Sequence, residues 1–304
     1  MTQSPDSTTL TPSLASFQHD LAQQTFPLSA LYVVATPIGN TADISLRALH
    51  VLGLVDAVAC EDTRDTAHLL TRYGLSKPLI AAHQHNEREV AQTIIARLQA
   101  GQRIALVSDA GTPAISDPGA RIVDAILTAG LRVIPLPGAS AAIAALSVGG
   151  LPNDHFYFVG FLPAKAGQRD AVLTQIRSIS ATLVLYEAPH RIIDTVAALI
   201  KLFESERQIV FAREISKLFE QIHRCALGAA SAWLAADPNH QKGEFVLLIE
   251  GAPTNADANA LETDHILQIL LSSCTVSQAA ALTAQITGQK KNALYQRALQ
   301  LKPD

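Results

Sequence analysis

The chain has 304 residues, a formal net charge of −4, and a composition that is 48% hydrophobic and 16% charged. These values are typical of a globular protein long enough for two domains, and they argue against a protein that coats nucleic acid non-specifically. Three scattered cysteines argue against a disulfide framework or a Cys-rich zinc site, and no apolar stretch is long enough to span a membrane. We therefore expect a cytoplasmic protein without a bound metal.

The first part of the chain is predicted to be a flexible extension that leads into a strand. Residues 1–29 are rich in Ser, Thr, Gln and Pro and lack a sustained hydrophobic period. A buried strand is expected at residues 31–35, followed by a polar Gly/Pro loop at 36–40. Asp43 is predicted to cap the helix that follows this loop.

Two polar clusters follow the next two predicted strands. The strand at 55–60 ends in a charged run at 61–64, and the short strand at 79–82 leads to residues 83–87, which include two histidines. A structural metal site needs four ligands, and no third or fourth ligand lies at a useful spacing, so we interpret the histidines as loop residues that contact substrate or water. The structural alternative for the charged run is a helix N-terminus whose acidic residues complement the helix dipole.

The long polar loop at residues 107–119 is predicted to be the centre of a ligand site. It follows an apolar strand that begins at residue 103 and precedes a helix over 120–129, so it lies at the sheet edge where open α/β sheets bind ligands. Its glycines, prolines and small hydroxyl residues let the backbone approach a ligand closely. Because it offers Asp109 and Asp117 but no basic residue, a cationic or neutral ligand fits better than a phosphate. An ordinary strand-to-helix connection is the alternative.

Strand and helix alternate five times in the first half of the chain, which predicts a mostly parallel sheet with helical crossovers. The last pair is a strand at 132–136 and, after a Pro-Gly turn, an alanine-rich helix at 139–148. Neither the G-x-G-x-x-G dinucleotide fingerprint nor the G-x-x-x-x-G-K-[ST] phosphate loop occurs. The sequence GGLPN at 149–153 indicates a domain boundary, so residues 30–150 are predicted to form the first domain.

Residues 151–252 are predicted to form a second, mixed α/β domain. Short connections in this part favour antiparallel pairing, and residues 213–217 are expected near a hairpin turn. Strands are predicted at 156–163, 182–186, 208–212, 221–226 and 245–249.

A linker at 252–259 is predicted to precede a small helical domain at 262–304. Its three expected helices, at 265–271, 277–286 and 290–299, suggest a helix-turn-helix arrangement. Lys290 and Lys291 are predicted to contact phosphate at the start of the last helix. The alternative is that these helices pack on the body or on a partner subunit, because three short helices need outside burial.

Eight motifs occur in order and together resemble one family. They are TPIGN at 36–40, CEDTR at 60–64, HQHNE at 83–87, SDAGTPAISDPG at 108–119, PGASA at 137–141, YEAPHR at 186–191, REISK at 213–217 and KGE at 242–244. The set is similar to the ribosomal RNA 2′-O-methyltransferases of the tetrapyrrole-methylase superfamily, the class III methyltransferases. It covers residues 31–251, with a weaker match through the helical tail.

This resemblance implies a two-domain α/β tetrapyrrole-methylase fold with S-adenosylmethionine in the cleft between the domains. The implied acceptor is a cytidine 2′-hydroxyl in the decoding region of 16S ribosomal RNA, free or in the small ribosomal subunit, and we expect a homodimer. The residues implied to bind the cofactor are Pro37, Asp109, Ala110, Gly111, Thr112, Pro113, Ile115, Ser116, Pro137, Gly138, Ser140, Ala141, Phe161, Tyr186 and Glu187.

The methyl acceptor is expected beside the two polar clusters, which neighbouring parallel strands would project from one sheet edge. The candidate catalytic residues are Glu61, Asp62, Arg64, His85 and Glu87. Arg64 would orient a phosphate and one of the others would accept the hydroxyl proton; the sequence does not choose among them. Predicted RNA contacts are Arg191, Arg213, Lys217, Lys290 and Lys291. Methylation of a small tetrapyrrole and non-catalytic binding of RNA or cofactor remain alternative functions.

Overall fold

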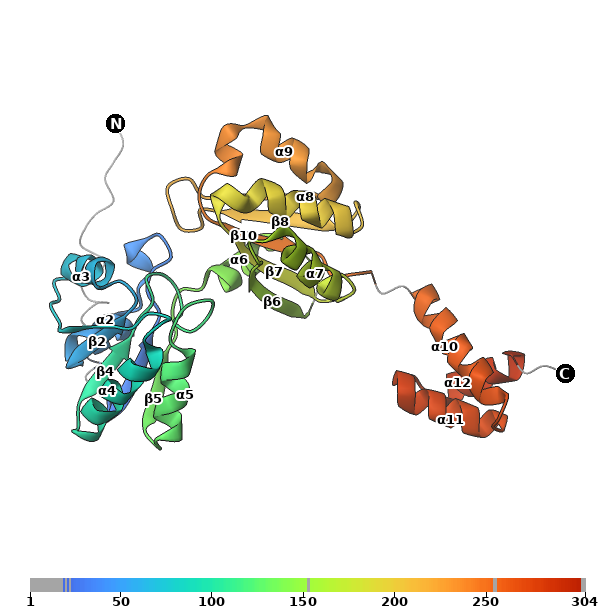
Figure 1. Cartoon of the computed structure of the whole chain (residues 1–304), viewed down its shortest axis with the longest axis horizontal. Coiled ribbons are helices and arrows are strands. Elements are labelled where there is room, and N and C mark those ends of the chain that lie inside the picture. Colours follow the sequence, from blue (N-terminus) through green and yellow to red (C-terminus); the bar gives the residue numbers. More distant parts are fainter. Residues whose placement is uncertain (1–18, 20, 22, 152–153, 254–255, 302–304) are drawn as a thin grey trace. The chain divides into compact units, whose positions relative to one another are not determined.

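The computed structural model describes residues 19, 21, 23–151, 154–253 and 256–301, without the side chains of 256–262. The chain forms two compact units, residues 1–251 and 252–304, each described by itself below. The first unit contains two five-stranded sheets, and the second is helical (Figure 1). Among the described residues, no helix combines the length and apolar character needed to cross a membrane.

The first sheet is entirely parallel, as the alternating pattern predicted, and its strand order is β3-β2-β4-β1-β5. Helices cover both of its faces, because each strand alternates apolar side chains between the two sides. Leu31, for example, packs against α4 and α5, and Tyr32 against α2 and α3. The elements are β1 (Ala30–Val34), α2 (Leu46–Leu54), β2 (Ala57–Cys60), α3 (Thr63–Arg72), β3 (Leu79–Ala81), α4 (Glu87–Gln99), β4 (Arg103–Leu106), α5 (Ala120–Thr128) and β5 (Arg132–Leu136).

The second sheet is mixed, as predicted, with the order β6-β7-β10-β8-β9 and parallel pairing between β6 and β7. The strands β8 and β9 form the expected hairpin around residues 213–217. Helices α7, α8 and α9 share an apolar core with one face of this sheet. The elements are β6 (Phe156–Phe161), α7 (Ala166–Ile176), β7 (Thr182–Glu187), α8 (Ile192–Leu202), β8 (Gln208–Arg213), β9 (Gln221–Ala226), α9 (Ala230–Ala236) and β10 (Phe245–Ile249).

The alanine-rich helix α6 (Ala141–Gly149) packs on the other face of the second sheet, although it follows the last strand of the first. Ala142 and Ala145 contact Val184, Val210 and Val246 in one buried cluster. Small side chains let the helix lie close to the strands. The predicted domain boundary at residue 150 therefore separates α6 from the sheet on which it packs.

Two predicted boundaries are wrong in detail. Asp43 does not cap a helix: it ends a short 3-10 turn and accepts a hydrogen bond from the Ser216 hydroxyl, while Ser45 caps α2 by accepting from the Ala48 N–H. The first tail helix, α10, begins at Ala256, inside the predicted linker.

The helical unit has a small core of its own. It consists of α10 (Ala256–Leu271), α11 (Val276–Thr287) and α12 (Lys291–Leu301). Leu267, Ala280, Leu294 and Ala298 form its buried cluster. Arg297 also binds Asp264 across the unit through two hydrogen bonds.

Most of the predicted N-terminal extension lies outside the described residues, but its last part contacts the first sheet. Phe26 packs on the α2 side of the sheet. The Pro27 carbonyl accepts a hydrogen bond of 2.8 Å from the Tyr32 hydroxyl, and the Phe26 carbonyl accepts one of 3.0 Å from Arg103.

Candidate functional site

The candidate site lies at the carboxyl edge of the first sheet, where the β1 loop (residues 36–40) meets the β4 loop (residues 107–119). These loops leave the sheet together because β1 and β4 are neighbouring strands. Thr36 and Gly111 exchange two backbone hydrogen bonds of 2.9 and 3.0 Å, and the Thr36 hydroxyl donates to the Ser108 carbonyl. The two predicted ligand loops are thus held against each other.

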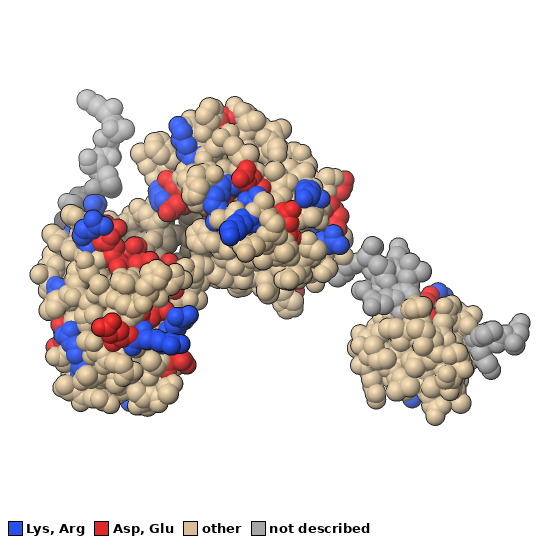
Figure 2. Space-filling view, in the orientation of Figure 1, with Lys and Arg blue, Asp and Glu red and all other residues tan. Residues whose placement is uncertain are grey.

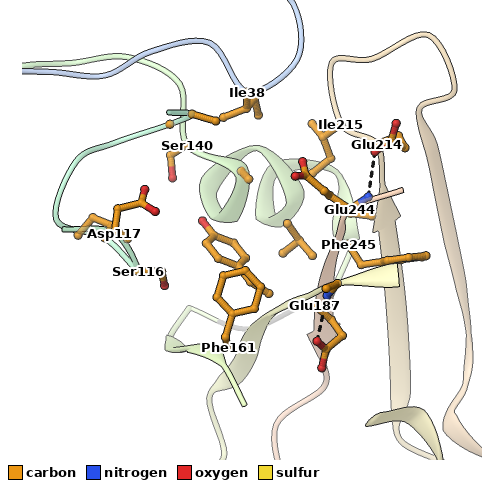
Figure 3. A pocket seen from close by; sticks show the side chains of 18 of the residues that line it. Ile38, Ser116, Asp117, Ser140, Phe161, Glu187, Glu214, Ile215, Glu244 and Phe245 are labelled. Carbon is orange, nitrogen blue, oxygen red and sulfur yellow. Dashed lines mark hydrogen bonds between the residues drawn. The ribbon is translucent and has the colours of Figure 1, made fainter. Parts of the chain in front are cut away.

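A cavity of about 290 Å³, here called the central cavity, opens between these loops and the second sheet (Figure 3). Ser116 and Asp117 lie across it from Glu214, Ile215 and Glu244 (Figure 3). Its lining residues are Ile38, Ala110, Gly111, Thr112, Ile115, Ser116, Asp117, Ser140, Ala141, Phe161, Tyr186, Glu187, Ala188, Pro189, Ala212, Glu214, Ile215, Lys217, Glu244, Phe245 and Val246.

The backbone is strained on both sides of this cavity. Five non-glycine residues of the described chain have positive φ, and four of them lie in the β4 loop or in the hairpin loop (residues 214–220). Ala114 and Ser116 have φ of 69° and 64°, and Glu214 and Ser216 have φ of 51° and 65°. Such conformations cost about 1–3 kcal/mol each and cluster at functional sites. The strain is consistent with loops shaped for a ligand.

Lys217 is fixed on the cavity wall by two carboxylates. Its Nζ lies 2.9 Å from Glu214 Oε1 and 2.8 Å from Glu244 Oε2. Burial opposes the charge of this lysine, but the two carboxylates outweigh burial and raise its pKa. Lys217 therefore stays protonated at neutral pH and is not a proton acceptor there.

Ten of the fifteen predicted cofactor residues line the central cavity: Ala110, Gly111, Thr112, Ile115, Ser116, Ser140, Ala141, Phe161, Tyr186 and Glu187. The other five, Pro37, Asp109, Pro113, Pro137 and Gly138, do not line it. The turn at Gly138 packs closely against the residue that follows β1, because a Cβ atom at Gly138 would lie 2.7 Å from the Ala35 Cβ. The predicted cofactor residues did not include Asp117 or most of the second-sheet wall, although the REISK and KGE motifs carry Glu214, Ile215 and Glu244.

The carboxylate of Glu187 is bound on the α8 side of the second sheet. It accepts a hydrogen bond from the Thr195 hydroxyl and lies 3.2 Å from Arg191 Nε. Tyr186, the preceding residue, belongs to the opposite, α6 face and accepts a hydrogen bond of 3.2 Å from the Ala142 N–H. Tyr186 therefore connects α6 to the cavity, whereas the Glu187 side chain fixes α8.

A second cavity of about 460 Å³, here called the side cavity, adjoins the β4 loop on its α4 side. Its lining residues are Glu61, Gln84, Glu87, Ala114, Ser116, Asp117, Pro118, Ala120 and Arg121. Glu87 is 6% exposed and accepts a 2.6 Å hydrogen bond from the Gly119 N–H. This bond ties the end of the β4 loop to α4.

The charged run after β2 is partly structural. Asp62 caps α3 by accepting from the backbone N–H groups of Arg64 and Asp65, and it pairs with the Arg64 guanidinium at 2.8 Å. The hydrogen bond from the Arg64 side chain lowers the pKa of Asp62 to about 2. The Asp62 N–H donates to Asp109 Oδ1 at 3.1 Å, so this run contacts the β4 loop.

The two predicted loop histidines lie near each other but do not form a recognisable metal site. The ring centroids of His83 and His85 are 6.2 Å apart. Within the part of the chain that the structure describes, no group of three or more His, Cys, Asp or Glu side chains is placed to hold a metal ion.

Asp117 lies among negative charges in the wall between the two cavities. Burial, followed by repulsion from Glu61 and Asp109, raises the pKa of Asp117 to about 6. A hydrogen bond with the Ser108 side chain acts in the opposite direction and lowers this pKa. Burial also raises the pKa of Glu61, as do the charges of Asp109 and Asp62. The loops after β2 and β4 therefore direct negative charge toward one place.

The predicted RNA contacts differ in how accessible they are. Arg213 is 8% exposed and donates to Gln221 and to the Lys242 carbonyl, so we do not place it on an RNA-binding surface. Arg191 is bound to Glu187. Lys290 and Lys291 are exposed. On the face in view in Figure 2, residues up to 251 carry both signs of charge and no broad basic field.

The chain matches two family models. Residues 30–231 match the family described as "Tetrapyrrole (Corrin/Porphyrin) Methylases", and residues 257–302 match "RsmI C-terminal HTH domain". The chain therefore belongs to the tetrapyrrole methylase family. It is similar to curated relatives named "Ribosomal RNA small subunit methyltransferase I". The Pseudomonas aeruginosa relative is 50% identical over 89% of this chain and 96% of its own, and the Escherichia coli O157:H7 relative is 50% identical over 89% and 94%.

A solved structure shares the fold of the larger unit. It is the uroporphyrin-III C-methyltransferase from Thermus thermophilus "complexed with S-adenyl homocysteine", with a TM-score of 0.51 and 17% sequence identity. The match covers 72% of this chain and 96% of that chain. This likeness confirms the predicted two-sheet α/β architecture.

Proposed function

We propose that the chain transfers the methyl group of S-adenosylmethionine to the 2′-hydroxyl of a cytidine in 16S ribosomal RNA. The observation that carries this proposal is a pair of adjoining cavities at the carboxyl edge of a parallel sheet. Two adjoining compartments suit a reaction that brings a methyl donor and a large acceptor together. The name of the relatives supports ribosomal RNA as the acceptor class. The 2′-hydroxyl and the cytidine rest on the sequence resemblance.

The central cavity fits S-adenosylmethionine in its chemistry. Apolar residues such as Ile38, Ile115 and Phe245 dominate its lining, and its four carboxylates outnumber its single lysine, so the cavity suits a cationic ligand better than a phosphate. Lys217 is already paired with Glu214 and Glu244, so a phosphate would meet negative charge there. When bound, the cofactor supplies an activated methyl group. The protein then contributes chiefly in-line positioning, which supplies as much as ~7–11 kcal/mol in well-oriented reactions.

We place the acceptor ribose at the side cavity. Glu61 and Glu87, two of the predicted catalytic residues, line this cavity together with Arg121. Arg64, with 85% of its side chain exposed, is proposed to orient an RNA phosphate nearby. Asp62 holds Arg64, and His85 is exposed on the loop after β3, where it remains a candidate contact.

The helical unit is proposed to engage RNA. The family model that it matches describes a helix-turn-helix domain. Lys290 is exposed directly before α12, and Lys291 is exposed as its first residue. Backbone N–H groups at the start of a helix also favour phosphate. The proposed substrate places the enzyme in the cytoplasm. The proposed homodimer is tested directly by the solution mass of the full chain.

The proposed reaction is tested with labelled cofactor and 16S ribosomal RNA, free and in small subunits. The full chain is expected to transfer label to one cytidine in the decoding region. Replacing that nucleotide by its 2′-deoxy counterpart should abolish transfer, because the accepting oxygen is missing. Label on a base atom, or transfer to uroporphyrinogen but not to RNA, would contradict the proposal in favour of a different acceptor.

Neutralising the two tail lysines is expected to weaken RNA binding. The double variant Lys290→Gln, Lys291→Gln should raise the KM for RNA several-fold. The slope of log K for RNA binding against log salt concentration should become less steep by about one for each phosphate that the tail no longer neutralises. Cofactor affinity and the rate at saturating RNA should stay unchanged. Lys165→Gln, an exposed lysine at the start of α7, is the matched control. If the double variant and the Lys165→Gln control had equal KM values for RNA, Lys290 and Lys291 would not be part of the RNA-binding surface.

A further inference from the structure

Two residues line both cavities among the described residues: Ser116 and Asp117. This shared wall is where a group leaving the central cavity would enter the side cavity. A serine hydroxyl is a poor proton acceptor, whereas an ionised carboxylate can accept a proton from a reacting hydroxyl. The chain's own geometry thus singles out one titratable side chain at the junction.

We propose that Asp117 is the catalytic residue that accepts the proton of the acceptor hydroxyl. This inference rests on the methyl transfer proposed above. As the hydroxyl oxygen forms its bond to the methyl carbon, its proton passes to an Asp117 carboxylate oxygen. The electron pair of the broken carbon–sulfur bond remains on sulfur, which becomes a neutral thioether, and Asp117 later releases the proton to solvent.

The surrounding structure supports this role by holding Asp117 at the junction. Ser116, directly before it, has φ of 64°, and the Gly119 N–H two residues later is bound by the buried Glu87. Figure 3 shows Asp117 on the side of the central cavity opposite the second sheet. Glu87 is committed to this bond, so we assign it to positioning the β4 loop.

The charges around Asp117 also favour proton uptake. Glu61 after β2 and Asp109 in the β4 loop face Asp117, as does the neutral Ser108. On β7, burial and the charge of Asp117 both raise the pKa of Tyr186. Glu87 and Arg121 line the side cavity beside it, 3.8 Å from each other. Burial and the two carboxylates raise the pKa of Asp117 to about 6, close to the value that suits a base at neutral pH. Asp62, with a pKa of about 2, is too weak a base for the same task.

The test compares Asp117→Asn with the wild type in single-turnover methylation at saturating cofactor and RNA. We expect the variant to lose at least about tenfold, and up to ~10⁴-fold, in rate. Its cofactor Kd should stay within about threefold. The wild-type rate should fall as pH drops through about 6, as Asp117 becomes protonated, and the variant should lose this dependence. Asp117→Glu should recover part of the rate. Asp124→Asn, an exposed carboxylate on α5, should behave as wild type.

Thermal melting shows whether the variant remains folded. The native pKa of Asp117 lies above its unfolded value of roughly 3.9, so ionisation of Asp117 destabilises the native state as pH rises through about 6. Asp117→Asn should therefore melt at or above the wild-type temperature at pH 8. A variant that methylates RNA at the wild-type rate overturns the assignment, as does a rate loss matched by lost cofactor affinity. A wild type that methylates no RNA overturns the proposed function itself.

Discussion

Replacing Gly111 with valine is expected to weaken the binding of S-adenosylmethionine at least tenfold, which corresponds to about 1.4 kcal/mol. Gly111 has φ of 78°, a conformation that a β-branched residue adopts only at high cost. Its N–H and C=O both bond to Thr36, so a shift of its backbone separates the β1 and β4 loops. A Cβ at this position would lie 3.5 Å from Ile38 Cγ2 at the cavity wall, an ordinary contact, so the expected loss comes from the displaced backbone. Calorimetric titration with the cofactor measures the effect.

Gly130→Val is the matched control for this substitution. Gly130 has nearly the same φ, 71°, but lies after α5, where an added Cβ meets nothing within 4 Å. Both variants should lose on the order of 1–2 kcal/mol of stability from backbone strain. Only Gly111→Val should lose cofactor affinity. A dissociation constant within a factor of two of wild type for Gly111→Val would remove the β4 loop from the cofactor site.

Replacing Gly251 with alanine is expected to be the most destabilising of these changes. A Cβ atom at this position would lie 1.7 Å from the Ser180 carbonyl oxygen, so the end of β10 must move away from the start of β7. The two strands pair along five residue positions, from Phe245 to Ile249, in the core of the second sheet. We expect a loss of about 3 kcal/mol, the upper part of the range for overpacking, and a fall in Tm of roughly 6–12 °C.

Gly167→Ala provides the comparison for Gly251→Ala. Gly167 lies in the first turn of α7, and an added Cβ there has no neighbour within 4 Å. Alanine suits a helix better than glycine by about 0.5–1 kcal/mol, so the Tm should stay or rise slightly. Differential scanning calorimetry of both variants measures the contrast. Similar melting temperatures would show that β10 adjusts to the added methyl group and that the close approach to Ser180 is unimportant.

The local pattern of the sequence was sufficient for the type and order of most elements. The apolar runs from Leu31 and Arg103 are strands, and the polar residues after them form the loops of the candidate site. An unbroken apolar run predicts a strand at these places, because a strand that is buried on both faces must be apolar throughout. Helix starts were less certain: both Asp43 and Ser45 are good caps, and the bond to Ala48 formed with Ser45.

The sequence by itself predicted two α/β domains and a helical tail, and it singled out the β4 loop as a candidate ligand loop. Only the tertiary structure placed Asp117, Glu214 and Glu244 around one cavity, because residues more than 90 positions apart come together through sheet order rather than local spacing. The tertiary structure also buries Arg213, and it places Glu87 where its carboxylate accepts a hydrogen bond from the Gly119 N–H. A residue's type limits what it can do, but its burial and partners decide whether it binds, catalyses or holds the fold.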